Sequence, residues 1–213
     1  MTAAADALLV VVLLLNFFVL GSSRIRSIIY TVAAQGVILG VLPMFVHGGL
    51  GVREAIVSIG AITLKAVVIP RMLMRAMVDL AIRREIEPLV GYRTSLVLGA
   101  LATGASLALA RHLPTVETTA VQLLVPASLA TMLTGFIVLT TRIKAITQVL
   151  GYLIVENGVF IFGLLLLEAM PFLVEVGVLL DLFVAIFVMG IIINHISREF
   201  SSVSTERLST LKE

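Results

Sequence analysis

The chain has 213 residues, of which 60% are hydrophobic and 13% are charged, and its formal net charge is +2. In soluble domains about a quarter of the residues are charged. The lower charged fraction of this chain and its mean hydropathy of +1.15 therefore indicate a protein of the lipid bilayer. The sequence has no cysteine, which excludes disulfides, cysteine-ligated iron–sulfur clusters and covalently attached haem.

Seven apolar segments follow one another along the chain, and each is long enough to cross a membrane as a helix. The expected helices occupy residues 4–21, 27–46, 54–78, 93–110, 118–140, 145–168 and 173–196. No lysine or arginine precedes Arg24, so the first segment lacks the basic start of a signal peptide and is interpreted as a retained helix. The sequence therefore predicts an all-α polytopic membrane protein with about seven transmembrane helices.

Basic residues are distributed unevenly between the two sides of these helices. If all seven segments cross the membrane, twelve of the fifteen lysines and arginines share one side: Arg24, Arg26, Arg71, Arg75, Arg83, Arg84, Arg93, Arg142, Lys144, Arg198, Arg207 and Lys212. Arg53 and Arg111 fall on the other side, and Lys65 lies within a helix. Cytoplasmic loops carry the excess of basic residues, so the sequence predicts an external N-terminus and a cytoplasmic C-terminus.

Three ionisable residues stand out because they lie far from the ends of the expected membrane helices. Lys65 is in the third segment, Glu156 is near the middle of the sixth, and Asp181 is in the seventh. A charge at the centre of a span costs roughly 2.5–3.5 kcal/mol on the insertion scale, and such residues face the interior of a bundle and mark ion or proton pathways. These three residues are therefore candidates for a proton or ion relay.

A polar stripe leads to Glu156. Lys144, Gln148, Tyr152 and Glu156 are spaced four residues apart, so they share one face of the expected helix. Lys144 at the inner surface would feed or bias the relay, and Gln148 and Tyr152 would line it.

Two interpretations of the membrane charges stay open. In the first, Glu156 and Lys65 exchange protons, because burial disfavours the charged form of both groups and brings them towards exchange. In the second, a static ion pair such as Lys65 with Glu156 holds two helices together.

Two further features concern the shape of the helices. Pro70 follows Lys65 by about one turn and predicts a kink in the third segment. Small residues allow helices to pack closely in membranes, and this role is expected of Gly60, Gly104, Gly135, Gly151 and Gly163.

The stretch "TTRIKAITQVLGYLIVENGVFIFGLLLL", followed by "VEVGVLLDLFVAIFVMGIIINHI", closely resembles component E of formate-hydrogenlyase-type, group-four nickel–iron hydrogenases. "LKAVVIPRML" is similar to the N-terminal half of the same family. The last three helices also resemble, more distantly, the K subunit of respiratory complex I and the C subunit of Mrp-type antiporters. Glu156 matches the central glutamate of those subunits, and Asp181 is the nearest carboxylate to their second one.

The resemblance implies a division into an N-terminal four-helix membrane region (1–117), a K-subunit-like three-helix region (118–196) and a polar cytoplasmic tail (197–213). It implies a non-catalytic accessory subunit in the inner (plasma) membrane of a prokaryote, which helps a redox complex to move protons or sodium ions.

The resemblance also implies which partners and cofactors to expect. The subunit would bind no cofactor itself, because nickel–iron and iron–sulfur centres would lie in soluble hydrogenase-like partners. Its membrane partners would be antiporter-like subunits, an anchor subunit and lipid, and no nucleic acid. Two alternatives stay open, namely a subunit of a cation/proton antiporter without redox chemistry and a purely structural subunit.

Overall fold

The structure is a computed structural model that describes residues 2–47, 59–60, 62–79, 89–113 and 121–165. Regular structure in these residues is helical: α1 (Thr2–Gly21), α2 (Ile25–His47), the π-helix η1 (Thr63–Val68), α4 (Ile69–Asp79), α5 (Tyr92–Ala110), α6 (Leu124–Thr141) and α7 (Ala145–Gly163). Five of these helices, α1, α2, α5, α6 and α7, are long and apolar enough to cross a membrane. The chain is therefore an all-α, multi-pass membrane protein.

The helix bounds agree closely with the segments expected from the sequence, with two differences. α6 begins at Leu124 instead of residue 118, and the residues just before it form a turn. Pro126 then lies in the first turn of α6. The N–H groups of a first turn have no acceptor within the helix, so a proline is tolerated there. α7 ends as an α-helix at Gly163, before the expected residue 168. The expected helix at 173–196, with Asp181, lies outside the described residues.

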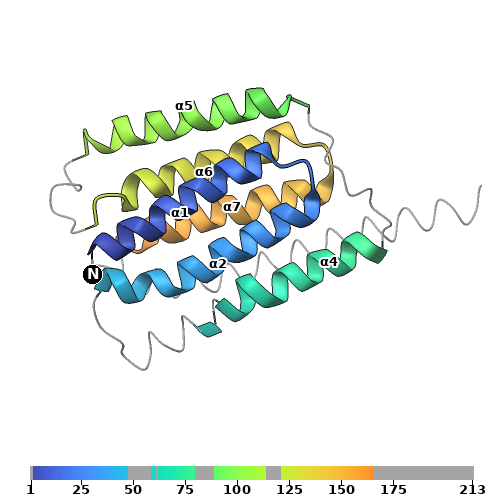
Figure 1. Ribbon diagram of the computed structural model, residues 1–213, viewed down its shortest axis with the longest axis horizontal. Coiled ribbons are helices and arrows are strands. Elements are labelled where there is room, and N and C mark those ends of the chain that lie inside the picture. Colours follow the sequence, from blue (N-terminus) through green and yellow to red (C-terminus); the bar gives the residue numbers. More distant parts are fainter. Residues whose placement is uncertain (1, 48–58, 61, 80–88, 114–120, 166–213) are drawn as a thin grey trace, which may run out of the picture.

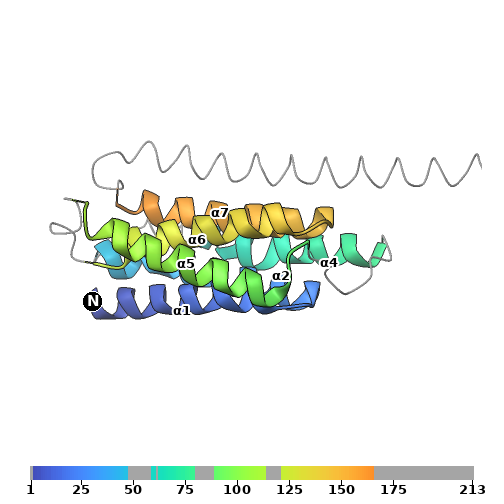
Figure 2. The same cartoon turned by 90° about the horizontal axis from the view of Figure 1, so that it is seen from above.

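The helices run side by side along the long axis of the molecule. Figure 1 shows α5 at one edge and α4 at the opposite edge, with α1, α2, α6 and α7 between them. Seen from above, α1 and α2 form one layer and α6 and α7 another (Figure 2). Contacts cross between the layers, since α1 packs on α6 and α2 packs on α7. The first and last described helices thus belong to one bundle.

α6 and α7 approach each other until their backbones touch. A Cβ added at Gly135 would lie 2.6 Å from the backbone nitrogen of Val155, and one at Gly158 would lie 2.7 Å from that of Met132. A Cβ at Gly151 would meet the backbone of Leu139 at 2.9 Å. The three glycines therefore make α6 and α7 a tightly packed helical hairpin, as small residues do in membranes.

The sequence expectation was correct for Gly135 and Gly151, whereas the described residues make no close contact with three other glycines. A Cβ at Gly60, Gly104 or Gly163 would meet nothing within 4 Å among the described residues, so the packing role expected of these three glycines stays a prediction. The close contacts that the expectation missed include those of Gly158 with α6 and of Gly36 and Gly40 of α2 with Lys65 and Ile62. Which glycine faces a neighbour depends on the rotation of each helix, and the presence of a glycine alone does not give that rotation.

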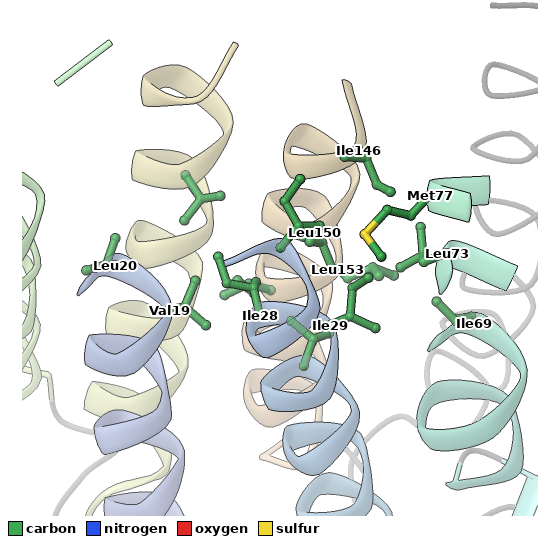
Figure 3. Packing of buried hydrophobic residues seen from close by; sticks show 14 residues of the cluster. Val19, Leu20, Ile28, Ile29, Ile69, Leu73, Met77, Ile146, Leu150 and Leu153 are labelled. Atoms are coloured by element: carbon green, nitrogen blue, oxygen red, sulfur yellow. The ribbon is translucent and has the colours of Figure 1, made fainter. Parts of the chain in front are cut away.

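Two clusters of buried apolar residues fill the bundle, one towards each end. The first joins the end of α1 and the start of α2 to α4 and to the start of α7, through residues such as Leu20, Ile28, Leu73 and Leu150 (Figure 3). The second joins the start of α1 to the ends of α2 and α7. Near this second cluster, Asp6 of α1 accepts a hydrogen bond of 3.2 Å from the backbone N–H of Leu123 and so caps the start of α6.

Candidate functional site

Buried polar side chains form a layer between the two apolar clusters. On α1, Asn16 lies between Val12 of one cluster and Val19 of the other. Each of the other three central helices repeats this order along its length: Gln35 in α2, Thr131 in α6 and Asn157 in α7. The middle of the bundle is therefore polar, and apolar packing separates it from both ends.

Lys65 and Glu156 form an ion pair in this layer. The Nζ of Lys65 lies 2.7 Å from Oε1 of Glu156, and the two side chains are only 8% and 9% exposed. A carboxylate and an ammonium that neutralise each other lower the cost of burying both in a medium of low polarity. The structure thus brings together two of the three residues whose charges stood out within apolar segments.

Lys65 reaches the pair from the π-helix η1. The backbone N–H of Ile69 bonds to the carbonyl of Leu64, five residues earlier, which is the wider spacing of a π-turn. Pro70 follows immediately, and a proline removes one N–H from the ladder and crowds the carbonyl four residues before it. The structure therefore has a π-turn that contains Lys65 directly before Pro70. The kink expected at Pro70 stays a prediction.

Two further groups of α7 surround the ammonium of Lys65. Its Nζ donates a hydrogen bond of 3.4 Å to Oδ1 of Asn157, and it lies 5.2 Å from the centre of the Phe160 ring. A cation over an aromatic face is attracted by the electron density of the ring. Together with Glu156, these groups form a site on α7 that fits an ammonium.

A single file of side-chain amides continues from Asn157 across the bundle. Nδ2 of Asn157 donates to Oε1 of Gln35 at 3.3 Å, and Nε2 of Gln35 donates to Oδ1 of Asn16 at 2.8 Å. Nδ2 of Asn16 then donates to the hydroxyl oxygen of Thr131 at 2.9 Å. We call Asn157, Gln35, Asn16 and Thr131 the amide chain. It links α7, α2, α1 and α6 at the level of the ion pair.

Other residues of the predicted stripe lie nearer the end of the bundle. Lys144 is half-buried and is the N-cap residue of α7. Gln148 is exposed, and its Nε2 donates to the carbonyl oxygen of Arg142 at 3.3 Å. Tyr152 is half-buried, one turn before Glu156. Asp181 lies outside the described residues. Within the described part of the chain, no group of three or more His, Asp or Glu side chains is arranged to hold a metal ion.

Arg142 is a buried residue that sequence reasoning placed in an inner loop. It is 1% exposed, and its Nη2 donates to the carbonyl oxygen of Leu20, at the end of α1, at 3.0 Å. Its guanidinium lies 5.1 Å from the centre of the Tyr92 ring. Burial lowers the pKa of Arg142 from its usual value, and Tyr92 acts in the opposite direction. Arg142 thus connects the α6–α7 turn to α1 and α5.

Sequence reasoning also missed Asn16, Gln35, Asn157 and Thr131. The signal was present, because "LLLNFF" and "VAAQGV" each place one amide inside an apolar run. Neutral amides, however, cost much less than charges in a membrane helix, so they stand out less.

Comparison with known proteins gives one family relationship. No protein-family model matches the chain, and no solved structure matches it. The chain is similar to uncharacterized protein Rv0085 of Mycobacterium tuberculosis (strain ATCC 25618 / H37Rv), with 31% identity over 195 residues that cover 89% of this chain and 87% of the relative. At this identity and coverage, the chain belongs to the family of Rv0085.

Proposed function

We propose that this protein is an accessory membrane subunit of a hydrogenase-like or complex-I-like redox complex. In this proposal, it helps to couple electron transfer in partner subunits to the movement of protons or sodium ions. The observation that carries the proposal is the Lys65–Glu156 ion pair, buried in a polar layer in the middle of the bundle. The resemblance of "QVLGYLIVENG" to component E of group-four hydrogenases supports the redox partners.

The geometry of the pair suits proton exchange. At 2.7 Å, a proton can pass from the ammonium to the carboxylate without movement of either helix. The pair has no net charge before and after this transfer, so neither state leaves an isolated charge in the membrane. An ion that enters or leaves the layer would shift the balance between the two states, and this is how the pair would take part in a relay.

The proposal includes a topology of seven membrane helices, with the N-terminus outside and the C-terminus in the cytoplasm. The ends of α1, α4 and α6 and the starts of α2, α5 and α7 lie together at one end of the bundle (Figure 1). These helix ends and the turns between them carry Arg24, Arg26, Arg75, Arg93, Arg142 and Lys144. A basic end of this kind faces the cytoplasm under the positive-inside rule, in a prokaryotic inner membrane.

In this proposal, Lys144 would bias the relay from the cytoplasmic side, and Asp181 would belong to the same relay. Nickel–iron and iron–sulfur centres would lie in soluble partners, and antiporter-like and anchor subunits would contact this chain in the membrane. A subunit of a cation/proton antiporter would need the same pair, and the genes next to this one would separate the two cases. Neighbouring genes for a nickel–iron large subunit favour the redox complex, whereas antiporter genes alone favour the antiporter.

The competing role of the pair is a static contact between η1 and α7. The experiment that separates the two roles replaces Glu156 by glutamine, which keeps the size but cannot take up or release a proton. A relay predicts an assembled complex with intact redox centres and strongly reduced ion pumping into proteoliposomes. Glu156→Asp keeps the carboxyl group and is expected to retain more pumping than Glu156→Gln.

A static pair predicts a different result, because removal of one partner leaves a buried charge at a cost of about 3–5 kcal/mol. Assembly of Glu156→Gln would then fail, and the double variant Glu156→Gln/Lys65→Met would restore it. Normal pumping by an assembled Glu156→Gln complex would refute the relay.

A further inference from the structure

The amide chain has one direction along its whole length. Each amide accepts a hydrogen bond through its oxygen on the side of Lys65 and donates one through its nitrogen on the far side. The donors follow the order Lys65, Asn157, Gln35, Asn16, and the last acceptor is the hydroxyl of Thr131. The amide dipoles therefore align head to tail, with their negative ends towards the ammonium.

Aligned amides act on the charge at the head of the chain. A positive charge is stabilised by an amide oxygen that faces it, and it polarises that amide, which strengthens the next hydrogen bond. The effect is largest where water is absent, and all four residues of the amide chain are buried. An amide chain of the opposite direction would present an N–H group to Lys65 and would destabilise its charged form.

We propose that Asn157, Gln35 and Asn16 are positioning residues that hold the proton on Lys65 and so bias the Lys65–Glu156 pair towards its ionised form. The function of this bias rests on the proposed relay. Lys65 and Glu156 can exchange a proton only if the ionised and the neutral form of the pair are close in energy. The amides themselves do not carry the proton, since they neither gain nor lose one near neutral pH.

Among the described residues, α7 and α2 both place groups around Lys65. Glu156 is the titratable side chain that α7 places against the ammonium, and Asn157 and Phe160 are its neutral neighbours there. From α2, Gly36 lies against the backbone of Lys65, and Gln35 reaches Lys65 through Asn157. The carboxylate of Glu156 and the amide chain thus stabilise the ammonium together, from two directions.

The alternative is that the amide chain only fixes how four helices pack. Buried polar networks can specify packing without any effect on a neighbouring charge. The two roles differ in what a break in the amide chain changes. A packing role predicts a loss of stability alone, whereas a positioning role predicts that Lys65 gives up its proton more easily.

The protonation of Lys65 can be measured directly, because the sequence has only three lysines, Lys65, Lys144 and Lys212. The full-length chain, labelled with ¹⁵N at the lysine side chains and placed in lipid bilayers, is studied by solid-state NMR. Ammonium and neutral amine nitrogens give separate signals, and Lys65→Met assigns those of Lys65. The quantity compared is the ratio of ammonium to amine at one alkaline pH where both wild-type signals are visible.

Gln35→Met breaks the amide chain and keeps a long unbranched side chain in its place. The ammonium-to-amine ratio of Lys65 is expected to fall about threefold. This is less than the effect of removing a hydrogen bond made directly to a charged group, because Gln35 acts on Lys65 through Asn157. Asn16→Ala breaks the next link without adding bulk and is expected to lower the ratio in the same direction by a smaller factor. Thr134→Val removes another buried hydroxyl of α6, outside the amide chain, and is the matched control with an unchanged ratio.

An unchanged ratio in a folded Gln35→Met protein would overturn the proposal. If that variant does not fold, Asn16→Ala decides in the same way, and an equal change in Thr134→Val would also overturn it. This test is independent of ion transport. A lowered ratio in Gln35→Met together with normal pumping by Glu156→Gln would keep the positioning role and reject the relay. An unchanged ratio together with reduced pumping by Glu156→Gln would reject the positioning role alone.

Discussion

Gly36 of α2 and Lys65 of η1 lie so close that a Cβ on Gly36 would be 2.8 Å from the Cβ of Lys65. The same added atom would lie 3.3 Å from the carbonyl carbon of Lys65, so the backbone itself is near. Gly40 makes a similar contact with Ile62 one turn away. α2 therefore packs directly against the π-turn. The absence of a side chain at position 36 leaves room for the backbone of Lys65, whose side chain reaches α7.

The first prediction concerns this contact. Gly36→Ala is expected to push η1 away from α2 and to lower the free energy of unfolding by about 1–3 kcal/mol, the usual cost of overpacking. The matched control is Gly104→Ala on α5, where an added Cβ meets nothing within 4 Å in the described part of the chain. The control is expected to be neutral or to gain up to about 1 kcal/mol from helix propensity. Denaturant unfolding of the purified chain in detergent measures both, and equal stabilities would refute the contact.

The second prediction concerns Arg142. Arg142→Gln removes the charge-assisted bond to the carbonyl of Leu20 and is expected to cost about 1.5–3 kcal/mol. Arg142→Lys is expected to recover only part of this loss, because an ammonium lacks the planar guanidinium that stacks on the Tyr92 ring. Arg93→Gln changes an exposed arginine near the start of α5 and serves as the control. A stability of Arg142→Gln equal to that of the control would show that the buried guanidinium does not hold the α6–α7 turn.

The third prediction concerns Asp6, which caps α6 from another helix. Asp6→Leu leaves the N–H of Leu123 without its acceptor and is expected to lower the free energy of unfolding by about 1 kcal/mol. Asp6→Asn keeps an acceptor oxygen of the same reach, so it is expected to lose much less. Thermal unfolding of the two variants side by side tests the cap, and equal losses would assign the effect to the charge of Asp6 instead of its hydrogen bond.

The fourth prediction is topological. A reporter that is active only in the cytoplasm, fused after Glu213, is expected to be active, because the proposed topology places the basic helix ends and the C-terminus in the cytoplasm. A second reporter that is active only outside, fused at the same position, is expected to be silent. The reverse pattern would show that the number of membrane crossings is even or that the orientation is inverted.

The sequence was sufficient to identify five membrane helices and to single out Lys65 and Glu156, which the structure brings together as an ion pair. Long apolar runs give helices of predictable length, and Lys65 and Glu156 stand out because a charge inside such a run is costly. Long apolar runs and the charges inside them are both local in sequence, so they can be recognised without knowledge of how the helices pack.

The amide chain and the burial of Arg142 could not be predicted in the same way. Asn16 and Gln35 acquire a role only when α1 and α2 turn these side chains towards α6 and α7, and that rotation follows from packing across the bundle. Arg142 looks like an ordinary loop residue in "TTRIK", and its burial depends on the end of α1, which lies more than a hundred residues earlier in the sequence. Interactions between distant segments decide both cases.

The polar layer has an electrical consequence. Lys65, Glu156 and the amide chain lie at one depth in the bundle, with an apolar cluster on each side. A charge that crosses the whole membrane works against about 2.3 kcal/mol for every 100 mV of membrane potential, whereas a charge that moves at constant depth does not sense this field. In the proposed relay, proton exchange between Lys65 and Glu156 would therefore be electrically silent. If the protein moves ions as proposed, the current would arise where an ion crosses one of the two apolar clusters, and the voltage dependence of transport would report on those crossings.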